Sequence, residues 1–298
     1  MVISQICKKF NLEYVGNDVD INGLNLIGRF TSKDSVLSYV TKGAYSNKIK
    51  TDNSIKALII PESLIDKYKD IMMEKKGCLI ISNDSENSFY QIHDYLYNTH
   101  TFYNSIVTEP KISDTAIIHP TAVIEKNVII EDDVNIGAFS VVKAGSIIKK
   151  GTHIGNHSII GAEGFQVLRI DDIPTKISHC GGVLIDCNVS IGDHCTVCNT
   201  LFDGFTKIGT NTKIDNYCQI AHYVSIGNNV IITPGVVLVG GVTIEDDCYI
   251  GANATIMNKV IVHKNAIVGI GSVVMQNVKS GATVFGNPAK QISQNWEN

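Results

Sequence analysis

The stretch IGTNTKIDNYCQIAHYVSIGNNVIITPGVVLVGGVTIEDDCYIGANATIMNKVIVHKNAIVGIGSVV (residues 208–274) decides the fold of this chain of 298 residues. Every sixth residue in it, from Ile208 to Val274, is aliphatic. A period of six matches neither the 3.6 residues of a helical turn nor the alternation of a lone strand. It matches a short strand followed by a turn, repeated many times, which is the hexapeptide pattern of a parallel β-helix.

The same period extends through most of the chain after residue 111. It runs from Ile112 to Ile160, returns from Ile185 to Val197, and then continues from Ile208, which makes 24 hexads. Three hexads close one triangular coil of 18 residues, so we expect about eight coils. With a strand spacing of about 4.8 Å, the prism is roughly 40 Å long. We therefore predict a mainly β chain.

A second column of small or β-branched residues follows four positions after each aliphatic residue. Cys195, Cys218 and Cys248 belong to this column, where a cysteine acts as a small apolar side chain. The sequence has a single CxxC pair, Cys195 and Cys198, and a zinc site of that kind needs two such pairs. We expect free thiols and no metal.

The hexapeptide period breaks twice, at about 162–182 and at 198–207. An insertion in a repeat protein leaves the regular coils as a loop and tends to lie on the binding face. We therefore predict two loops that project from the prism.

Residues 1–105 lack the repeat and are predicted to form a small α/β domain that precedes a β-helix domain at 106–298. Apolar runs indicate two buried strands, and the segments that follow them have helical spacing, with Asp84 or Ser85 as a cap of the second helix. The strands are expected at 56–62 and 76–84, and the helices at 62–75 and 85–98.

Composition excludes several classes of protein. The net charge is −4, the isoelectric point is near 6.1, and the only arginines are Arg29 and Arg169, which argues against a nucleic-acid partner. No apolar run reaches the roughly 18–20 residues that cross a bilayer, and no signal-peptide pattern is present at the start. Eight cysteines are too few for a disulfide-stapled fold. We expect a cytoplasmic protein.

Three segments resemble one family. The segment KIDNYCQIAHYVSIG (213–227) looks like the catalytic segment of UDP-3-O-acylglucosamine N-acyltransferases. The segment IGAEGFQV (160–167) is similar to their Gly-Phe loop, and residues 18–49 look like their nucleotide-binding domain. The resemblance implies a left-handed prism, a nucleotide-binding domain at 1–105, and homotrimers with active sites between adjacent prisms.

The sequence also departs from that family. Asn258 stands where the family has a second histidine, and the segment SGATVFGNPAKQI (280–292) is similar to small sugar acetyltransferases that use CoA. These departures favour an N-acyltransferase that moves a short acyl group from acyl-CoA to the amine of a nucleotide-linked amino sugar. Enzymes that act on dTDP-4-amino-4,6-dideoxyglucose are of this type. Acyl-CoA is then a co-substrate, and no tightly bound cofactor is expected.

Two alternatives stay open. One is the lipid A enzyme itself, UDP-3-O-acylglucosamine N-acyltransferase, which uses an acyl carrier protein as donor. The other is a β-helix scaffold that binds without chemistry. The sequence does not specify the sugar, the nucleotide base or the acyl length.

The expected catalytic group is built around His222, because a histidine titrates near neutral pH and can act as a general base. Gly240 and Asn258 follow it by 18 and 36 residues, so all three are predicted to stack on one edge of the prism, one coil apart. The resemblance implies that the Gly240 N–H serves as oxyanion donor. Asn258 is a candidate to hold the amine or the pantetheine arm. Asp215 and Asn216 are expected to orient His222 or the sugar.

The remaining candidates are binding residues. Tyr39 and Tyr45 align with the family's aromatic positions for the nucleotide base, although each could simply pack on its own domain. Phe165 in the first loop is a candidate to cover substrate or a partner surface. Lys290 and Asn287, in the segment GNPAK, are the candidates for CoA, with Lys290 near its phosphates.

Overall fold

The structure is a computed structural model that describes residues 1–298 except 30, 100–101, 104–107, 171 and 293–298. The described residues divide into two compact units. Unit 1 comprises Met1–Ile106, Phe165–Cys180 and Phe202–Gly204, and unit 2 comprises Val107–Gly164, Gly181–Leu201 and Phe205–Asn298. The predicted boundary between residues 105 and 106 lies outside the described residues.

Unit 1 is an α/β unit with one five-stranded sheet in the order β1-β5-β4-β3-β2. Strand β1 pairs antiparallel with β5, and the other pairings are parallel. Its strands are β1 (Glu13–Gly16), β2 (Gly23–Leu24), β3 (Val36–Tyr39), β4 (Ile55–Ile60) and β5 (Cys78–Ile81). Its helices are α1 (Ile3–Phe10), α2 (Ser46–Thr51), the 3-10 turn η1 (Glu62–Leu64), α3 (Ile65–Glu74) and α4 (Ser85–Asn98).

The strongest local signals of the N-terminal region are confirmed. Strands β4 and β5 and helices α3 and α4 lie where the apolar runs predict them. Asp84 is the N-cap of α4, and its carboxylate accepts a hydrogen bond from the Asn87 N–H at 3.2 Å. This bond satisfies one of the free N–H groups of the first turn. Helices α3 and α4 both pack on the central strand β4.

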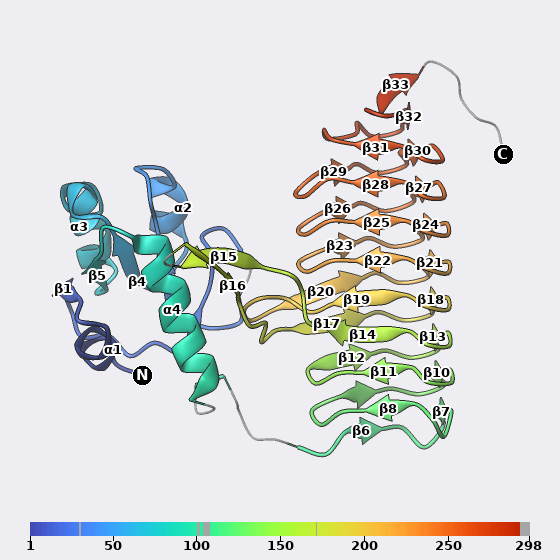
Figure 1. Ribbon diagram of the computed structural model, residues 1–298, viewed down its shortest axis with the longest axis horizontal. Helices are drawn as coiled ribbons and strands as arrows, with labels where there is room; N and C mark the ends of the chain where they lie inside the picture. Colours follow the sequence, from blue (N-terminus) through green and yellow to red (C-terminus); the bar gives the residue numbers. More distant parts are fainter. Residues whose placement is uncertain (30, 100–101, 104–107, 171, 293–298) are drawn as a thin grey trace. The chain divides into compact units, whose positions relative to one another are not determined.

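Unit 2 is the parallel β-helix that the hexapeptide period predicts, with the left-handed winding that the family resemblance implies. Figure 1 shows its short strands stacked one above another. Three sheets, parallel except for the last two strands of face 2, form faces 1, 2 and 3 of the prism. Face 1 consists of β6 (Lys111–Ile112), β9 (Ile129–Ile130), β12 (Ser146–Ile148), β17 (Gly182–Ile185), β20 (Phe205–Ile208), β23 (Ser225–Ile226), β26 (Thr243–Ile244) and β29 (Ile261–Val262).

The other two faces follow in each coil. Face 2 consists of β7 (Ile117–Ile118), β10 (Asn135–Ile136), β13 (His153–Ile154), β18 (Ser190–Ile191), β21 (Lys213–Ile214), β24 (Ile231–Ile232), β27 (Tyr249–Ile250), β30 (Ile267–Val268), β32 (Thr283–Phe285) and β33 (Lys290–Ile292). Face 3 consists of β8 (Val123–Ile124), β11 (Val141–Val142), β14 (Ile159–Ala162), β19 (Thr196–Cys198), β22 (Gln219–Ile220), β25 (Val237–Leu238), β28 (Thr255–Ile256) and β31 (Val273–Val274). Faces 1 and 3 have eight strands each, as eight coils require.

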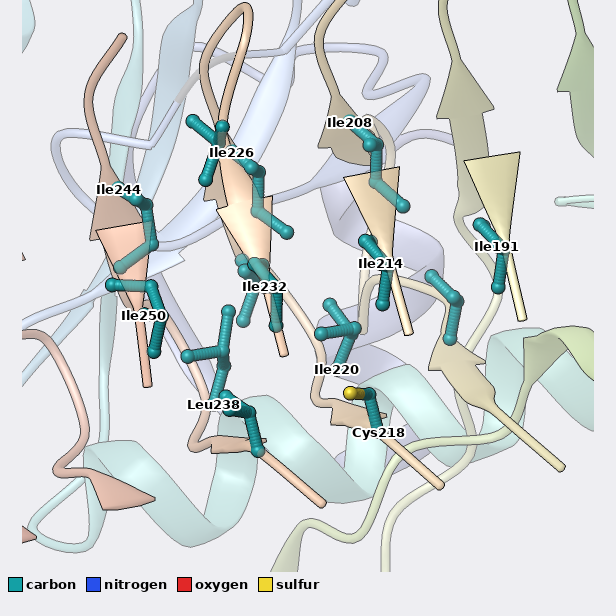
Figure 2. Packing of buried hydrophobic residues seen from close by; sticks show 14 of the residues in the cluster. Ile191, Ile208, Ile214, Cys218, Ile220, Ile226, Ile232, Leu238, Ile244 and Ile250 are labelled. Atoms are coloured by element: carbon teal, nitrogen blue, oxygen red, sulfur yellow. The ribbon is translucent and has the colours of Figure 1, made fainter. Parts of the chain in front are cut away.

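The core of unit 2 is the predicted aliphatic column. Figure 2 shows Ile214, Ile220, Ile226 and Ile232 pointing into the interior from successive strands. Each is at most 3% exposed, and burial of such a side chain contributes about 1.5–3 kcal/mol. The small column, including Cys195, Cys218 and Cys248, is buried beside it. All eight cysteines are free.

The two breaks in the period do not form simple loops of the prism. The first holds an antiparallel hairpin, β15 (Val167–Ile170) and β16 (Ile173–Lys176). Its residues and Phe202–Gly204 of the second break belong to unit 1. There, Asp203 accepts hydrogen bonds from Thr31 and Ser32, and the Phe202 ring packs against the Phe89 ring. The insertions therefore complete the core of unit 1.

Candidate active site

One corner of the prism, the turns that follow the strands of face 3, holds the predicted catalytic group. We call it corner 3. Strands β22, β25 and β28 pair in parallel with Ile220 opposite Leu238 and Leu238 opposite Ile256. Two residues after these positions come His222, Gly240 and Asn258, so they occupy equivalent places one coil apart. The Gly241 N–H donates to the His222 carbonyl at 2.9 Å, and the Lys259 N–H donates to the Gly240 carbonyl at 3.2 Å.

The His222 imidazole lies across Gly240. A Cβ atom on Gly240 would come within 2.7 Å of His222 Nε2 and 2.9 Å of Cε1. Real Cβ atoms do not approach other atoms so closely, so this rotamer of His222 requires a glycine at 240. The imidazole is half-buried, and the Tyr223 ring meets it edge to face at 5.9 Å between centroids. Corner 3 therefore places an imidazole nitrogen beside the backbone of Gly240, which no side chain of its own covers.

The backbone of Gly240 is the other reactive feature of this corner. Among the described residues its N–H makes no hydrogen bond. A backbone N–H without a partner, next to a general base, can donate to the oxyanion of a tetrahedral intermediate. The Asn258 side chain, one coil further on, is exposed. Its carboxamide both donates and accepts hydrogen bonds.

Asp215 and Asn216 do not join this group within one chain. They occupy the turn after β21, at the corner that follows face 2, which we call corner 2. Asn216 Oδ1 accepts a hydrogen bond from the Asp193 N–H at 2.6 Å, and the Asn216 N–H donates to the Asp215 carboxylate at 2.7 Å. The 18-residue period explains the difference, because a separation of six residues moves a side chain to the next corner. Their role in orienting His222 or the sugar therefore stays a prediction.

Tyr39 and Tyr45 have different surroundings in unit 1. The Tyr39 hydroxyl donates to Glu86 Oε1 at 2.7 Å, and its ring lies 4.9 Å from that of Phe89. Burial, followed by the neighbouring Tyr90 and Glu86, raises the pKa of Tyr39. Tyr45 is 53% exposed, and the Lys48 ammonium lies 5.9 Å from its ring centroid. The exposed ring of Tyr45, rather than the packed ring of Tyr39, is open to a ligand.

The other binding candidates are exposed. Phe165, at the start of the hairpin segment, is 80% exposed. Asn287 and Lys290 lie in the hairpin of β32 and β33 at the end of the prism. Tyr223, which contacts His222, was not singled out in the sequence, although its place directly after the histidine is the signal that could have found it. No group of three or more His, Cys, Asp or Glu that could hold a metal occurs in the described part of the chain.

Two family descriptions match the prism. Residues 109–144 and 205–240 match "Bacterial transferase hexapeptide (six repeats)", and residues 127–162 and 241–276 match "Hexapeptide repeat of succinyl-transferase". A curated relative from Staphylococcus aureus (strain JH9), 2,3,4,5-tetrahydropyridine-2,6-dicarboxylate N-acetyltransferase, is 57% identical over 53 residues. Those residues are 18% of this chain and 22% of the relative, so the match spans about a fifth of the relative's length.

Solved structures give weaker similarity. A UDP-N-acetylglucosamine acyltransferase from Campylobacter jejuni is 31% identical, with a TM-score of 0.39, over 61% of this chain and 74% of that one. The corresponding protein from Bacteroides fragilis 9343 is 22% identical, with a TM-score of 0.46, over 61% and 73%. No described helix has the length and apolar character needed to span a membrane.

Proposed function

We propose that this chain, which carries the hexapeptide repeats of the bacterial transferases, is an acyltransferase that moves a short acyl group from acyl-CoA to the amine of a nucleotide-linked sugar. The observation that carries the proposal is the column at corner 3, where the His222 imidazole lies across Gly240. The name of the Staphylococcus aureus relative, an N-acetyltransferase, supports amide formation as the reaction.

The reaction follows from the chemistry of this column. The amine nitrogen attacks the thioester carbonyl and forms a C–N bond, while His222 takes a proton from the amine. The Gly240 N–H donates to the oxygen on which negative charge develops. The intermediate then collapses, the C–S bond breaks, and the thiolate of CoA leaves and takes the proton from His222. The open backbone at Gly240 gives the thioester room to lie beside the imidazole.

Two features of unit 1 support a nucleotide-linked acceptor. The exposed ring of Tyr45, with the Lys48 ammonium beside it, suits a pyrimidine base and the phosphates that follow it. In the donor, CoA phosphates are assigned to the exposed Lys290, whose ammonium acts as a point charge.

The working assembly is proposed to be a homotrimer joined through face 3. The outward residues of this face carry no charge in any coil: Val123, Val141, Ile159, Thr196, Gln219, Val237, Thr255 and Val273. By contrast, Lys111 and Lys207 point outward from face 1, and Lys213 from face 2. An uncharged, largely β-branched face can be buried against a second copy at the least desolvation cost.

The test is an acyl-transfer screen read by mass spectrometry. The full chain is mixed with acetyl-CoA or 3-hydroxybutyryl-CoA and a panel of UDP- and dTDP-linked amino sugars. We expect a product heavier by one acyl group, and loss of that product in His222→Ala but not in His153→Ala, an exposed histidine on face 2.

Two other results would overturn the proposal. Product only with an acyl carrier protein thioester would indicate the lipid A reaction. No product with any donor, together with no shift in melting temperature on adding CoA or nucleotide sugar, would indicate a binding scaffold, because a ligand stabilises the state that it binds.

A further inference from the structure

Corner 2 of the prism carries a stack of four aromatic rings, which we call the aromatic ladder. The ring of Phe139 lies 5.0 Å from that of His157, His157 lies 5.0 Å from His194, and His194 lies 5.2 Å from Tyr217. The angles between successive ring planes are 18°, 3° and 1°. The four rings therefore form one continuous column over four coils.

The backbone under the ladder is in a conformation that such residues rarely adopt. The φ angles of Phe139, His157, His194 and Tyr217 are 58°, 55°, 55° and 60°. This left-handed region favours glycine, asparagine and aspartate, and most other turns of the prism use those residues. Strain of this kind persists where the side chain has a use. Phe139 is 58% exposed and Tyr217 is 66% exposed, so burial in unit 2 does not explain the choice.

The ladder ends at Tyr217 because the equivalent place in the next coil is Gly235. Strands β21 and β24 pair with Ile214 opposite Ile232, which sets Gly235 one coil after Tyr217. The Gly235 N–H donates to the Asn216 carbonyl at 3.0 Å. The carboxamide oxygen of Asn253, from the coil after that, occupies the space that a side chain on Gly235 would need. No ring from the next turn therefore covers the outer face of Tyr217.

We propose that this end of the ladder binds a nucleobase, which stacks on the outer face of Tyr217 and pairs at its edge with the Asn253 carboxamide. Stacking on an aromatic face is open to every base, since all of them have a planar π-surface. A carboxamide can donate to and accept from the edge of a base at the same time. A fifth ring in this position continues the spacing of the four that are present.

The base can come from either substrate of the proposed reaction. It is the adenine of the acyl donor or, if Tyr217 rather than Tyr45 holds the base of the acceptor, the pyrimidine of the sugar nucleotide. The inference rests on the proposed function only for the choice of the two ligands used to test it. Binding to the full chain is measured by titration calorimetry with two ligands, adenosine 3′,5′-bisphosphate and thymidine 5′-diphosphate. The ligand whose binding depends on Tyr217 identifies the source.

The variants separate ring stacking from structural support. Tyr217→Asn removes the ring and keeps a residue suited to positive φ. We expect about tenfold weaker binding of one of the two ligands, the low end of the usual loss when a stacking ring is removed. Tyr217→Phe keeps the ring and should bind as the wild type does. Phe139→Asn, at the opposite end of the ladder, is the matched control and should leave binding unchanged.

A second substitution covers the case in which Tyr217→Asn fails to fold. Gly235→Asn also suits positive φ, and its side chain would fill the place of the base, so it should abolish the same binding. Equal binding of both ligands by wild type and Tyr217→Asn would overturn the proposal. A change of oligomeric mass in Tyr217→Asn with unchanged nucleotide binding would overturn it too and assign the ladder to subunit contact. If His222→Ala loses acyl transfer but still binds the nucleotide, the reaction at His222 and base binding at Tyr217 are tested independently of each other.

Discussion

His222 depends on the absence of a side chain at Gly240, since the imidazole fills the space in which a Cβ atom would lie. Gly240→Ala should therefore push the imidazole away from its position and lower kcat of acyl transfer by at least about tenfold, because small displacements of catalytic groups are costly. Steady-state kinetics of the variant measure this, and the melting temperature should change little.

The control for Gly240→Ala is the same substitution in a His222→Ala background. If the glycine acts by making room for the imidazole, it should have no further effect on kcat once the imidazole is gone, as in any double-mutant cycle of coupled residues. Equal, additive losses in both backgrounds would show that Gly240 acts independently of His222, for instance only through its N–H.

His93 in helix α4 should make unit 1 sensitive to acid. It is fully buried, Nε2 lies 2.8 Å from the Ser178 carbonyl, and Nδ1 lies 2.7 Å from the Tyr103 hydroxyl. A carbonyl only accepts, so Nε2–H donates to it and Nδ1 accepts from Tyr103. Burial outweighs the hydrogen bond to Ser178 and lowers the pKa of His93 from 6.5 to about 4.

The sign of this effect follows from where the proton binds. The unfolded chain binds a proton at His93 below about pH 6.5, whereas the folded chain binds it only near pH 4. The contribution of neutral His93 to the free energy of unfolding is therefore fully present above pH 6.5, and it is lost as the pH falls toward 4. The loss at pH 4.5 relative to pH 7 should be about 2–3 kcal/mol larger for the wild type than for His93→Gln. Urea unfolding followed by tyrosine fluorescence reports on unit 1, which holds eight of the eleven tyrosines. The same pH dependence in both proteins would refute the assignment.

The residues of the candidate site differ in how far the sequence could place them. His222, Gly240 and Asn258 were predictable as a column, because an 18-residue separation in a regular coil returns to the same corner. Asp215 and Asn216 lie at the preceding corner, because a separation of six or seven residues in this solenoid leads to the next corner, so their expected role stays a prediction. The sequence did not reveal the aromatic ladder, because the two breaks in the period change the separation of its residues. Phe139 and His157 are 18 residues apart, but the first break lies between His157 and His194, and the second between His194 and Tyr217.

At the scale of the element, strand β24 provides an internal comparison. Ile232 points into the prism and is 1% exposed, whereas its neighbour Ile231 points outward and is 48% exposed. Ile232→Ala should lower the free energy of unfolding by about 2–5 kcal/mol, the usual cost of a cavity in a packed core. Ile231→Ala should change it by about 0.5 kcal/mol or less. Denaturant unfolding of the two variants measures the difference, and equal losses would contradict the assignment of faces.

The elements differ in how much of them local sequence reveals. Most strands of the prism have only two residues, and none could be predicted alone; the repeated period predicts them together. In unit 1, the apolar runs of β4 and β5 were found, whereas β2 has two residues and β3 carries the polar Ser38 in its buried stretch, so neither was found. The hairpin strand β16 contains Pro174, which argues against a strand, and an edge of a two-stranded ribbon is one place that tolerates it.

At the scale of the whole molecule, the sequence predicted two domains in simple succession, and the structure instead assigns insertions of the prism to unit 1. The contacts that do this are far apart in the chain. Thr31 and Asp203 are 172 residues apart, and His93 and Ser178 are 85 apart. No periodicity or local propensity reports such contacts, because they depend on which side chains meet only after both regions have folded.

The trimer proposal makes a prediction about mass and activity together. Val237 lies on an inner strand of the uncharged face 3, the third from its C-terminal end. Val237→Lys would bury a cation without a partner at each contact with a second copy, which costs several kcal/mol and should dissociate the assembly. Sedimentation equilibrium should give three times the chain mass of 32.4 kDa for the wild type and a single chain mass for the variant.

A matched substitution separates the effect of the face from that of the charge. Ile261 points outward from face 1 and is also half-buried, so Ile261→Lys places the same cation on a face that already carries Lys111 and Lys207. It should leave the mass unchanged. If Val237→Lys is monomeric and loses acyl transfer while Ile261→Lys keeps both properties, the reaction requires a second copy against face 3. If Val237→Lys is monomeric and retains full turnover, the column at His222 is complete in one chain. If Val237→Lys remains a trimer, face 3 is not the contact between subunits.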